Sequence, residues 1–226
     1  MLRALGHPGA GPWDCFSHSD RSHAIHRFIY LASQSPRRVQ LLDRIGVVHR
    51  PLLPGANEDA EALEKVRSAE LPRAYVQRVA MAKLVAARRR LALRRLPEAP
   101  ILTADTTVAL GRCILGKPRD ADEAADTLRR LSGRTHRVLT AVAVSAGPLS
   151  MLATSESTVR FATLSAHTID LYVASGEPFG KAGAYAVQGR IAAWIERIGG
   201  SPTGIMGLPL FETRQLLAQA RVRLDL

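Results

Sequence analysis

From Phe28 onward, the chain alternates short apolar runs with longer stretches in which apolar residues recur at helical spacing. Short apolar runs are typical of buried strands, and amphipathic stretches bounded by capping residues are typical of helices. The first helix is expected to begin at Ser35-Pro36 and to stop at Gly46. In this half of the chain the pattern predicts strands at 28–33, 101–105 and 108–111, and helices at 36–46, 73–96 and 120–131.

The second half of the chain predicts a long hairpin, two helices and further strands. A β stretch at 135–146 is expected to turn at Gly147-Pro148 into a partner at 150–163. Beyond it we expect a helix from Ser165 to Ala174, two strands within 182–201 and a closing helix at 211–220. Because hairpins occur among the alternating strands and helices, the pattern favours an α/β fold with a mixed twisted sheet and flanking helices.

Length and composition indicate the general class of protein and its domain organisation. The 226 residues, 46% of them hydrophobic, can bury one core or a two-lobed core without disulfides or structural metal. Two cysteines without paired spacing suit a reducing, cytoplasmic location, and no apolar run is long enough to predict a membrane-spanning helix. Residues 1–27 show neither strand nor helix periodicity, so we expect a disordered extension followed by a single domain at 28–226.

The net charge of +11 favours anionic partners such as nucleotides, nucleic acid or acidic lipid, but it does not choose among them. Much of the excess is arginine, and the arginines at 88–95 lie at the C-terminal end of a predicted helix, where positive charge complements the helix dipole. We therefore interpret most of the basic residues as solvated surface, and a nucleic-acid partner is not expected.

The first candidate site is the segment Ser33-Gln34-Ser35-Pro36-Arg37-Arg38, at a strand-to-helix junction. Free backbone N–H groups and the positive end of the helix dipole make such a junction suitable for phosphate. Arg37 and Arg38 oppose that dipole in the first turn, which favours a functional explanation in which they bind phosphate with the hydroxyls of Ser33 and Ser35. An N-cap serine followed by Pro at N1 and two solvated arginines is the alternative.

The second candidate is Asp105, which follows an apolar strand and precedes Thr106. A carboxylate at that position is costly to bury unless it binds a metal, accepts hydrogen bonds or acts as a base, whereas an ordinary turn aspartate is the alternative. Residues 111–117 match the start of a phosphate-binding P-loop, but Pro118 stands where that loop needs Ser or Thr, so we reject the P-loop. Lys117 remains a candidate phosphate ligand.

Three further residues indicate chemistry only weakly when each is taken alone. Glu58 lies in an acidic segment that could equally be solvated surface. Lys83 lies among apolar residues of a predicted helix, where an inward lysine needs an anionic partner. Gln188 lies in a run of small residues, and its amide could either hydrogen-bond a nucleobase edge or be an ordinary turn residue.

Taken together, these segments resemble the Maf family of nucleoside triphosphate pyrophosphatases, from Tyr30 to about Leu217. The resemblance implies a Maf/ITPase-like fold with two lobes around a central cleft. Its form at residues 182–189 is similar to the branch that acts on dTTP and UTP; the branch that acts on 7-methyl-GTP is the alternative. The motifs are LASQSPRR (31–38), NEDA (57–60), RVAMAKL (78–84), ADTTVAL (104–110), LGKP (115–118), SGRTHRVLTAVAV (132–144), SGEPFGKAGAYAVQG (175–189) and GLPL (207–210).

The resemblance implies hydrolysis between the α and β phosphates of a nucleoside triphosphate, with a divalent cation, Mg²⁺ or Mn²⁺, as cofactor. By that implication Asp105 is the general base, and Glu58 and Asp105 hold the metal. The remaining roles are phosphate binding by Lys83, Lys117, Ser33, Ser35 and Arg38, and substrate choice by Arg37, Thr106 and Gln188.

The resemblance also suggests a homodimer. Two departures from the family pattern are Asn57, where many relatives have Asp, and Gly180, where relatives often carry Asp. A protein of a different class, a regulator of cell division that binds nucleotide or nucleic acid without catalysis, is the alternative to the enzyme.

Overall fold

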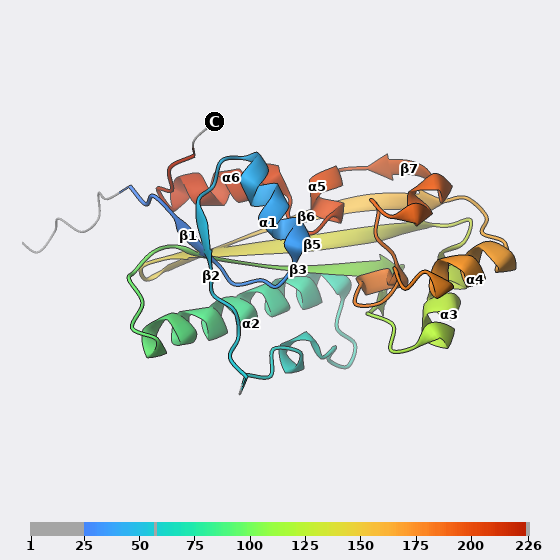
Figure 1. The fold of residues 1–226 in the computed structure, drawn as a ribbon, viewed down its shortest axis with the longest axis horizontal. Helices are drawn as coiled ribbons and strands as arrows, with labels where there is room; N and C mark the ends of the chain where they lie inside the picture. The colour runs from blue at the N-terminus through green and yellow to red at the C-terminus, as the bar shows by residue number, and fades with distance from the viewer. Residues whose placement is uncertain (1–24, 57, 225–226) are drawn as a thin grey trace, which may run out of the picture.

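A computed structural model describes residues 25–56 and 58–224, and these form one mixed seven-stranded sheet. The strand order is β2-β1-β3-β5-β6-β7, with β4 paired to β3 (Figure 1). β1 is parallel to both β2 and β3, whereas all other pairs are antiparallel. The strands are β1 (Ile29–Leu31), β2 (His49–Pro51), β3 (Ile101–Leu110), β4 (Cys113–Leu115), β5 (Thr135–Ala146), β6 (Leu149–Phe161) and β7 (Ile195–Gly199).

Helices cover both faces of the sheet and its far end, as Figure 1 shows. α2 packs on one face against β3 and β5, α1 and α6 lie on the opposite face, and α3 packs against α4 at the other end of the long strands. The helices are α1 (Pro36–Arg44), α2 (Pro72–Leu93), α3 (Ala121–Leu131), α4 (Ala166–Ala174), α5 (Pro202–Ile205) and α6 (Leu210–Gln219), with 3₁₀ turns η1 (Ala62–Glu64), η2 (Ala182–Ala184) and η3 (Arg190–Trp194). The described residues contain no helix long and apolar enough to cross a membrane.

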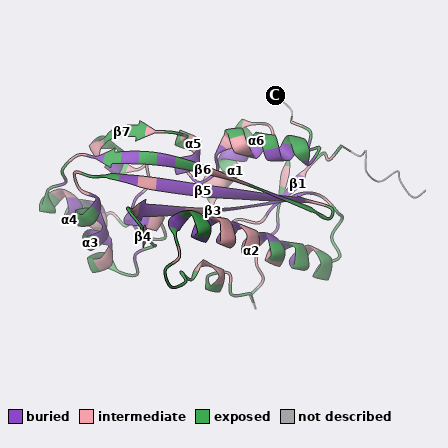
Figure 2. Ribbon diagram, turned by 180° about the vertical axis from the view of Figure 1, so that it is seen from behind, coloured by how far each residue is buried: buried purple, intermediate pink, exposed green. Residues whose placement is uncertain are grey.

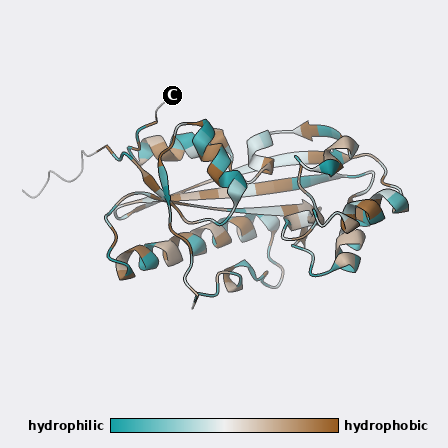
Figure 3. Ribbon diagram, viewed as in Figure 1, coloured by the Kyte–Doolittle hydropathy of each residue, from teal (hydrophilic) through white to brown (hydrophobic). Residues whose placement is uncertain are grey.

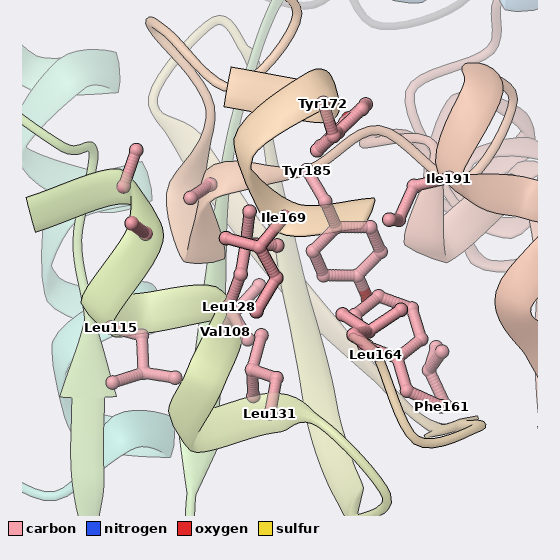
Figure 4. Close-up of a cluster of buried hydrophobic side chains, with 14 of the residues drawn as sticks. Val108, Leu115, Leu128, Leu131, Phe161, Leu164, Ile169, Tyr172, Tyr185 and Ile191 are labelled. Carbon is pink, nitrogen blue, oxygen red and sulfur yellow. The ribbon is translucent and has the colours of Figure 1, made fainter. Parts of the chain in front are cut away.

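The core is divided between two lobes, which confirms the predicted fold class. In the first lobe, separate apolar clusters lie beneath α2 and beneath α1 and α6. In the second lobe, α3, α4 and η2 enclose a cluster around Phe161, Tyr185 and Leu128, drawn in Figure 4. β3 and β5 are largely buried along their length (Figure 2), and apolar residues run along β1 and β5 (Figure 3), as expected for strands covered on both faces.

Local capping residues determine where several helices begin. Ser35 precedes α1 with Pro36 in its first turn, Asp120 accepts a hydrogen bond from the backbone of Glu123, and Ser165 accepts one from the backbone of Thr168. These starts agree with the sequence prediction, because each depends only on residues within one turn.

Two of the predicted segments differ in the structure, and β2, β4 and α5 were not predicted. β3 runs unbroken from Ile101 to Leu110, so Asp105 lies in mid-strand rather than at a strand end. Within 182–201 only β7 is a strand, and the preceding residues include the 3₁₀ turns η2 and η3. Gly183 has a φ of 70°, which is incompatible with a regular strand, and an added Cβ would lie 2.8 Å from Val108.

Candidate active site

A gap in strand pairing exposes the middle of β3. β5 pairs with one edge of β3 from Ile101 to Ala109, so β1 and β4 must both lie on the other edge. β1 pairs only with residues 101–102 and β4 only with 108–110, so no strand in the described part of the chain pairs with residues 103–107 on that edge. The chain leaves β1 at this gap and enters α1, so Asp105 and the segment 33–38 face the same opening.

Two adjoining cavities, of about 570 and 480 Å³, occupy this region between the lobes. Asp105, Thr106 and Gln188 line the larger one, whereas Ser33 and Glu58 line the smaller one. The two cavities share part of their walls, and every site residue predicted from the sequence lines at least one of them. The shared wall consists of Ser35, Arg37, Arg38, Glu64, Lys83, Lys117, Gly180 and Lys181.

Asp105 combines burial with an unused carboxylate oxygen. Its residue is 5% exposed, and Oδ1 accepts a hydrogen bond from Lys83 Nζ at 2.7 Å. Oδ2 is buried and has no hydrogen-bond partner among the described residues. Burial raises the pKa of Asp105, although the charges of Lys83 and Arg38 oppose that rise. A carboxylate in this state can accept a proton or hold a cation at Oδ2.

Glu64, at the end of η1, is a site residue that the sequence interpretation missed. Its Oε1 accepts a hydrogen bond from Lys83 Nζ at 2.8 Å, and its Oε2 accepts one from Lys117 Nζ at 2.6 Å. Burial alone would raise the pKa of Glu64, but the two lysines outweigh burial and lower it. Because Lys83 bonds both Glu64 and Asp105, these two carboxylates lie on either side of one ammonium group.

Glu58 has a different partner. It forms hydrogen bonds of 2.6–3.1 Å with the guanidinium of Arg90, which is itself buried and also donates to the carbonyl of Leu52. The hydrogen bond from Arg90 and one from the Gly55 backbone lower the pKa of Glu58 to about 2. The structure thus places Glu58 and Asp105 in different cavities and brings Glu64 to Asp105. Asn57 lies outside the described residues.

Arg38 is anchored on three sides, and Ser35 is left free to meet a ligand. Nε of Arg38 donates to the Gly207 carbonyl at 2.8 Å, one terminal nitrogen donates to Ser33 Oγ at 3.0 Å, and the other donates to Thr106 Oγ1 at 3.4 Å. Burial lowers the pKa of Arg38. The Ser35 side chain makes no capping hydrogen bond to α1, although it lines both cavities, which favours the ligand-binding interpretation of this segment.

The donor set fits a divalent cation that shares its ligands with phosphate. The described residues contain no cluster of three or more His, Cys, Asp or Glu side chains able to hold a metal by themselves. They do supply the unpartnered Oδ2 of Asp105 and the neighbouring carboxylate of Glu64. Mg²⁺ is typically held by one or two carboxylates, with water and substrate phosphates completing its octahedron, so this pair fits such an ion.

Comparison of the chain with known proteins identifies a family and several relatives. Residues 28–220 match the family described as Maf-like protein. The dTTP/UTP pyrophosphatase of Albidiferax ferrireducens is 60% identical over 193 residues, covering 85% of this chain and 96% of the relative. The proteins of the same name from Ralstonia nicotianae and a Polaromonas species are 60% and 59% identical, covering 89% and 87% of this chain and 98% of each relative.

Proposed function

Because the chain belongs to the Maf-like protein family, we propose that it hydrolyses dTTP and UTP to the nucleoside monophosphate and pyrophosphate. The relatives named dTTP/UTP pyrophosphatase match this chain over nearly their whole length, which supports this substrate class. The observation that carries the proposal is Asp105, which lines a cavity walled by arginine and lysine and keeps one buried carboxylate oxygen without a hydrogen-bond partner among the described residues.

The cavity walls suit a triphosphate. A nucleoside triphosphate carries about four negative charges, and their neutralisation at the transition state is the main electrostatic requirement of the reaction. Arg37, Arg38, Lys83, Lys117 and Lys181 line the larger cavity. Glu64 accepts hydrogen bonds from two of these lysines, Lys83 and Lys117, so its carboxylate fixes their positions in the cavity wall.

Asp105 is suited to activate water. Lys83 fixes Oδ1, which leaves Oδ2 to take a proton from a water molecule that attacks the α phosphorus. The oxygen of that water bonds to phosphorus, and the P–O bond to the β phosphate breaks. Lys117 and Arg38 can bond the departing pyrophosphate.

A divalent cation, Mg²⁺ or Mn²⁺, fits this scheme, with Asp105 and Glu64 as its protein ligands. When bound, it would polarise the phosphoryl oxygens and neutralise charge on the leaving group. We assign Glu64 this role on its position, while Glu58 anchors its own loop to Arg90. The shared cation of Glu58 and Asp105 expected from the family resemblance stays a prediction, as do the homodimer and the cytoplasmic location.

The test is product analysis. Purified protein is incubated with dTTP, UTP, CTP or 7-methyl-GTP in Mn²⁺ or Mg²⁺, with EDTA as the control, and products are separated by ion-exchange chromatography. We expect pyrophosphate and monophosphate from dTTP and UTP, and no turnover in EDTA. Orthophosphate as first product, or no turnover of any triphosphate, would contradict the proposal. A clear preference for 7-methyl-GTP would keep the reaction but replace the substrate.

A further inference from the structure

A chain of hydroxyl groups connects the larger cavity to a carbonyl group of α5. Thr106, half-buried on β3, lines the cavity and lies 2.9 Å from the hydroxyl of Thr140 on β5. Thr140 is completely buried, and its hydroxyl donates to the carbonyl of Gly204 at 2.7 Å. At the other end, Arg38 donates to the Thr106 hydroxyl.

The direction of every hydrogen bond in this chain follows from its two ends. The carbonyl of Gly204 can only accept, so Thr140 uses its single hydrogen there and can offer Thr106 only a lone pair. Thr106 must therefore donate its own hydrogen to Thr140. The guanidinium of Arg38 can only donate, which agrees with Thr106 accepting from that side. As a result, Thr106 presents its remaining lone pair, and no hydrogen, to the cavity.

An acceptor-only hydroxyl restricts which part of a nucleotide can lie beside it. Phosphate oxygens also accept, so they cannot hydrogen-bond to Thr106, and the nucleoside part of the substrate must supply the donor. Thymine and uracil carry an N–H at ring position 3, whereas cytosine has a bare nitrogen there and donates only from its amino group at position 4. Gln188, whose amide both donates and accepts, lines the same cavity and can bond a neighbouring polar group of the base.

We propose that Thr140 is a positioning residue for base selection: by taking the hydroxyl hydrogen of Thr106, it makes the cavity favour a pyrimidine with N–H at position 3 over cytosine. The proposal rests on the proposed hydrolysis of dTTP and UTP. Thr140 itself touches no substrate, because it has no exposed surface.

The test compares Thr140→Val with Thr140→Ser. Valine has nearly the shape of threonine but leaves the Thr106 hydrogen free to turn into the cavity and donate to cytosine, whereas serine keeps the acceptor. We expect the ratio of kcat/KM for UTP to that for CTP to fall roughly tenfold in Thr140→Val, the effect of about one hydrogen bond, and to stay near the wild-type value in Thr140→Ser. An equal loss on both substrates, or an unchanged ratio, would overturn the proposal.

Two further measurements separate the alternatives. A sugar hydroxyl could also supply the donor, so Thr140→Val is assayed with dTTP and 2′,3′-dideoxy-TTP. If the ratio of kcat/KM for these two substrates changes while the UTP to CTP ratio does not, the assignment of the donor to the base is overturned. If Thr140→Val does not fold, the test is made on the wild-type protein with 3-methyl-UTP, which lacks the N–H. We expect this nucleotide to be a roughly tenfold poorer substrate than UTP, and equal turnover would refute the proposal. Failure of the wild-type protein to release pyrophosphate from UTP or dTTP would instead refute the proposed function.

Discussion

Substitution of two glutamates can decide which carboxylate works with Asp105. The carboxylate of Glu64 pairs with Lys83 and Lys117, and Lys83 also pairs with Asp105. Glu64→Gln removes that negative charge. The amide keeps the size of the side chain but loses one acceptor oxygen and the charge that suits a cation. We expect kcat/KM to fall roughly 100-fold, the scale of one positioned charged group at a reacting centre.

Glu58→Gln is the matched control, because it makes the same chemical change in the neighbouring cavity. Glu58 holds the buried guanidinium of Arg90, so we expect the free energy of unfolding to fall by about 1–2 kcal/mol. This estimate is below that for a fully buried pair because the side chain of Glu58 is 36% exposed. The activity of the folded fraction should remain close to that of the wild type.

Both variants are assayed for pyrophosphate release from dTTP and for unfolding in urea under the same buffer and metal concentration. We expect opposite effects in the two variants. Glu64→Gln should lose activity and keep its free energy of unfolding within about 1 kcal/mol of the wild type, whereas Glu58→Gln should lose stability and keep activity. The opposite pattern, with Glu58→Gln inactive and Glu64→Gln active within twofold, would refute the assignment of Glu64 and restore Glu58 as the partner of Asp105.

Three other predictions follow from buried groups. Asp105→Asn should stay folded and lose at least roughly 100-fold in kcat/KM, and full activity of the variant would exclude Asp105 as the base. Because burial raises the pKa of Asp105, the loss of wild-type activity on acidification should begin at a higher pH than an ordinary aspartate would cause. Burial lowers the pKa of His136 to about 4, so between about pH 6.5 and 4 this histidine is protonated only in the unfolded chain. The free energy of unfolding should therefore be lower by about 2 kcal/mol at pH 5 than at pH 8. Urea unfolding of His136→Gln, which should lack this component, is the comparison, and equal pH dependence of the two proteins would count against the prediction. Gly183→Ala should destabilise the fold by about 1–3 kcal/mol, because its φ is 70° and its Cβ would lie 2.8 Å from Val108; a thermal denaturation midpoint equal to that of the wild type would show that η2 adjusts without cost.

Signals that act within a few residues were sufficient to predict much of the fold. Pro36 after Ser35 and the capping side chains of Asp120 and Ser165 predict three helix starts correctly, and the turn at Gly147 places the β5–β6 hairpin. The two strands predicted at 101–105 and 108–111 both lie in β3, but the predicted break between them was wrong, because Asp105 and its flanking threonines favour a turn when taken alone. In the folded protein Thr103 donates to the carbonyl of Ala80, and β5 pairs along the whole segment, so tertiary partners override the local preference.

The candidate site could be predicted only in part, for a related reason. The segment 33–38, Asp105, Lys83 and Lys117 stand out because charged or hydroxylic residues occur next to apolar runs. Glu64 carries no such signal, since it is one acidic residue in a polar segment. Its importance depends on Lys83 and Lys117, 19 and 53 residues away in sequence. The packing of η1 against α2 brings Glu64 to Lys83, and no local pattern in the sequence predicts that contact.

The continuity of the long strands limits how the protein can take up its substrate. β5 pairs with β6 without interruption from Thr135 to Ala146, and both strands extend through both lobes (Figure 1). A hinge opening between the lobes would therefore break the hydrogen bonds of this strand pair. Gln188 lies in a segment that η2 and the buried Tyr185 fix to the sheet, because Gly183 donates to the Gly116 carbonyl and Tyr185 bonds His136 of β5. We therefore expect substrate and product to be exchanged without a large displacement of one lobe relative to the other.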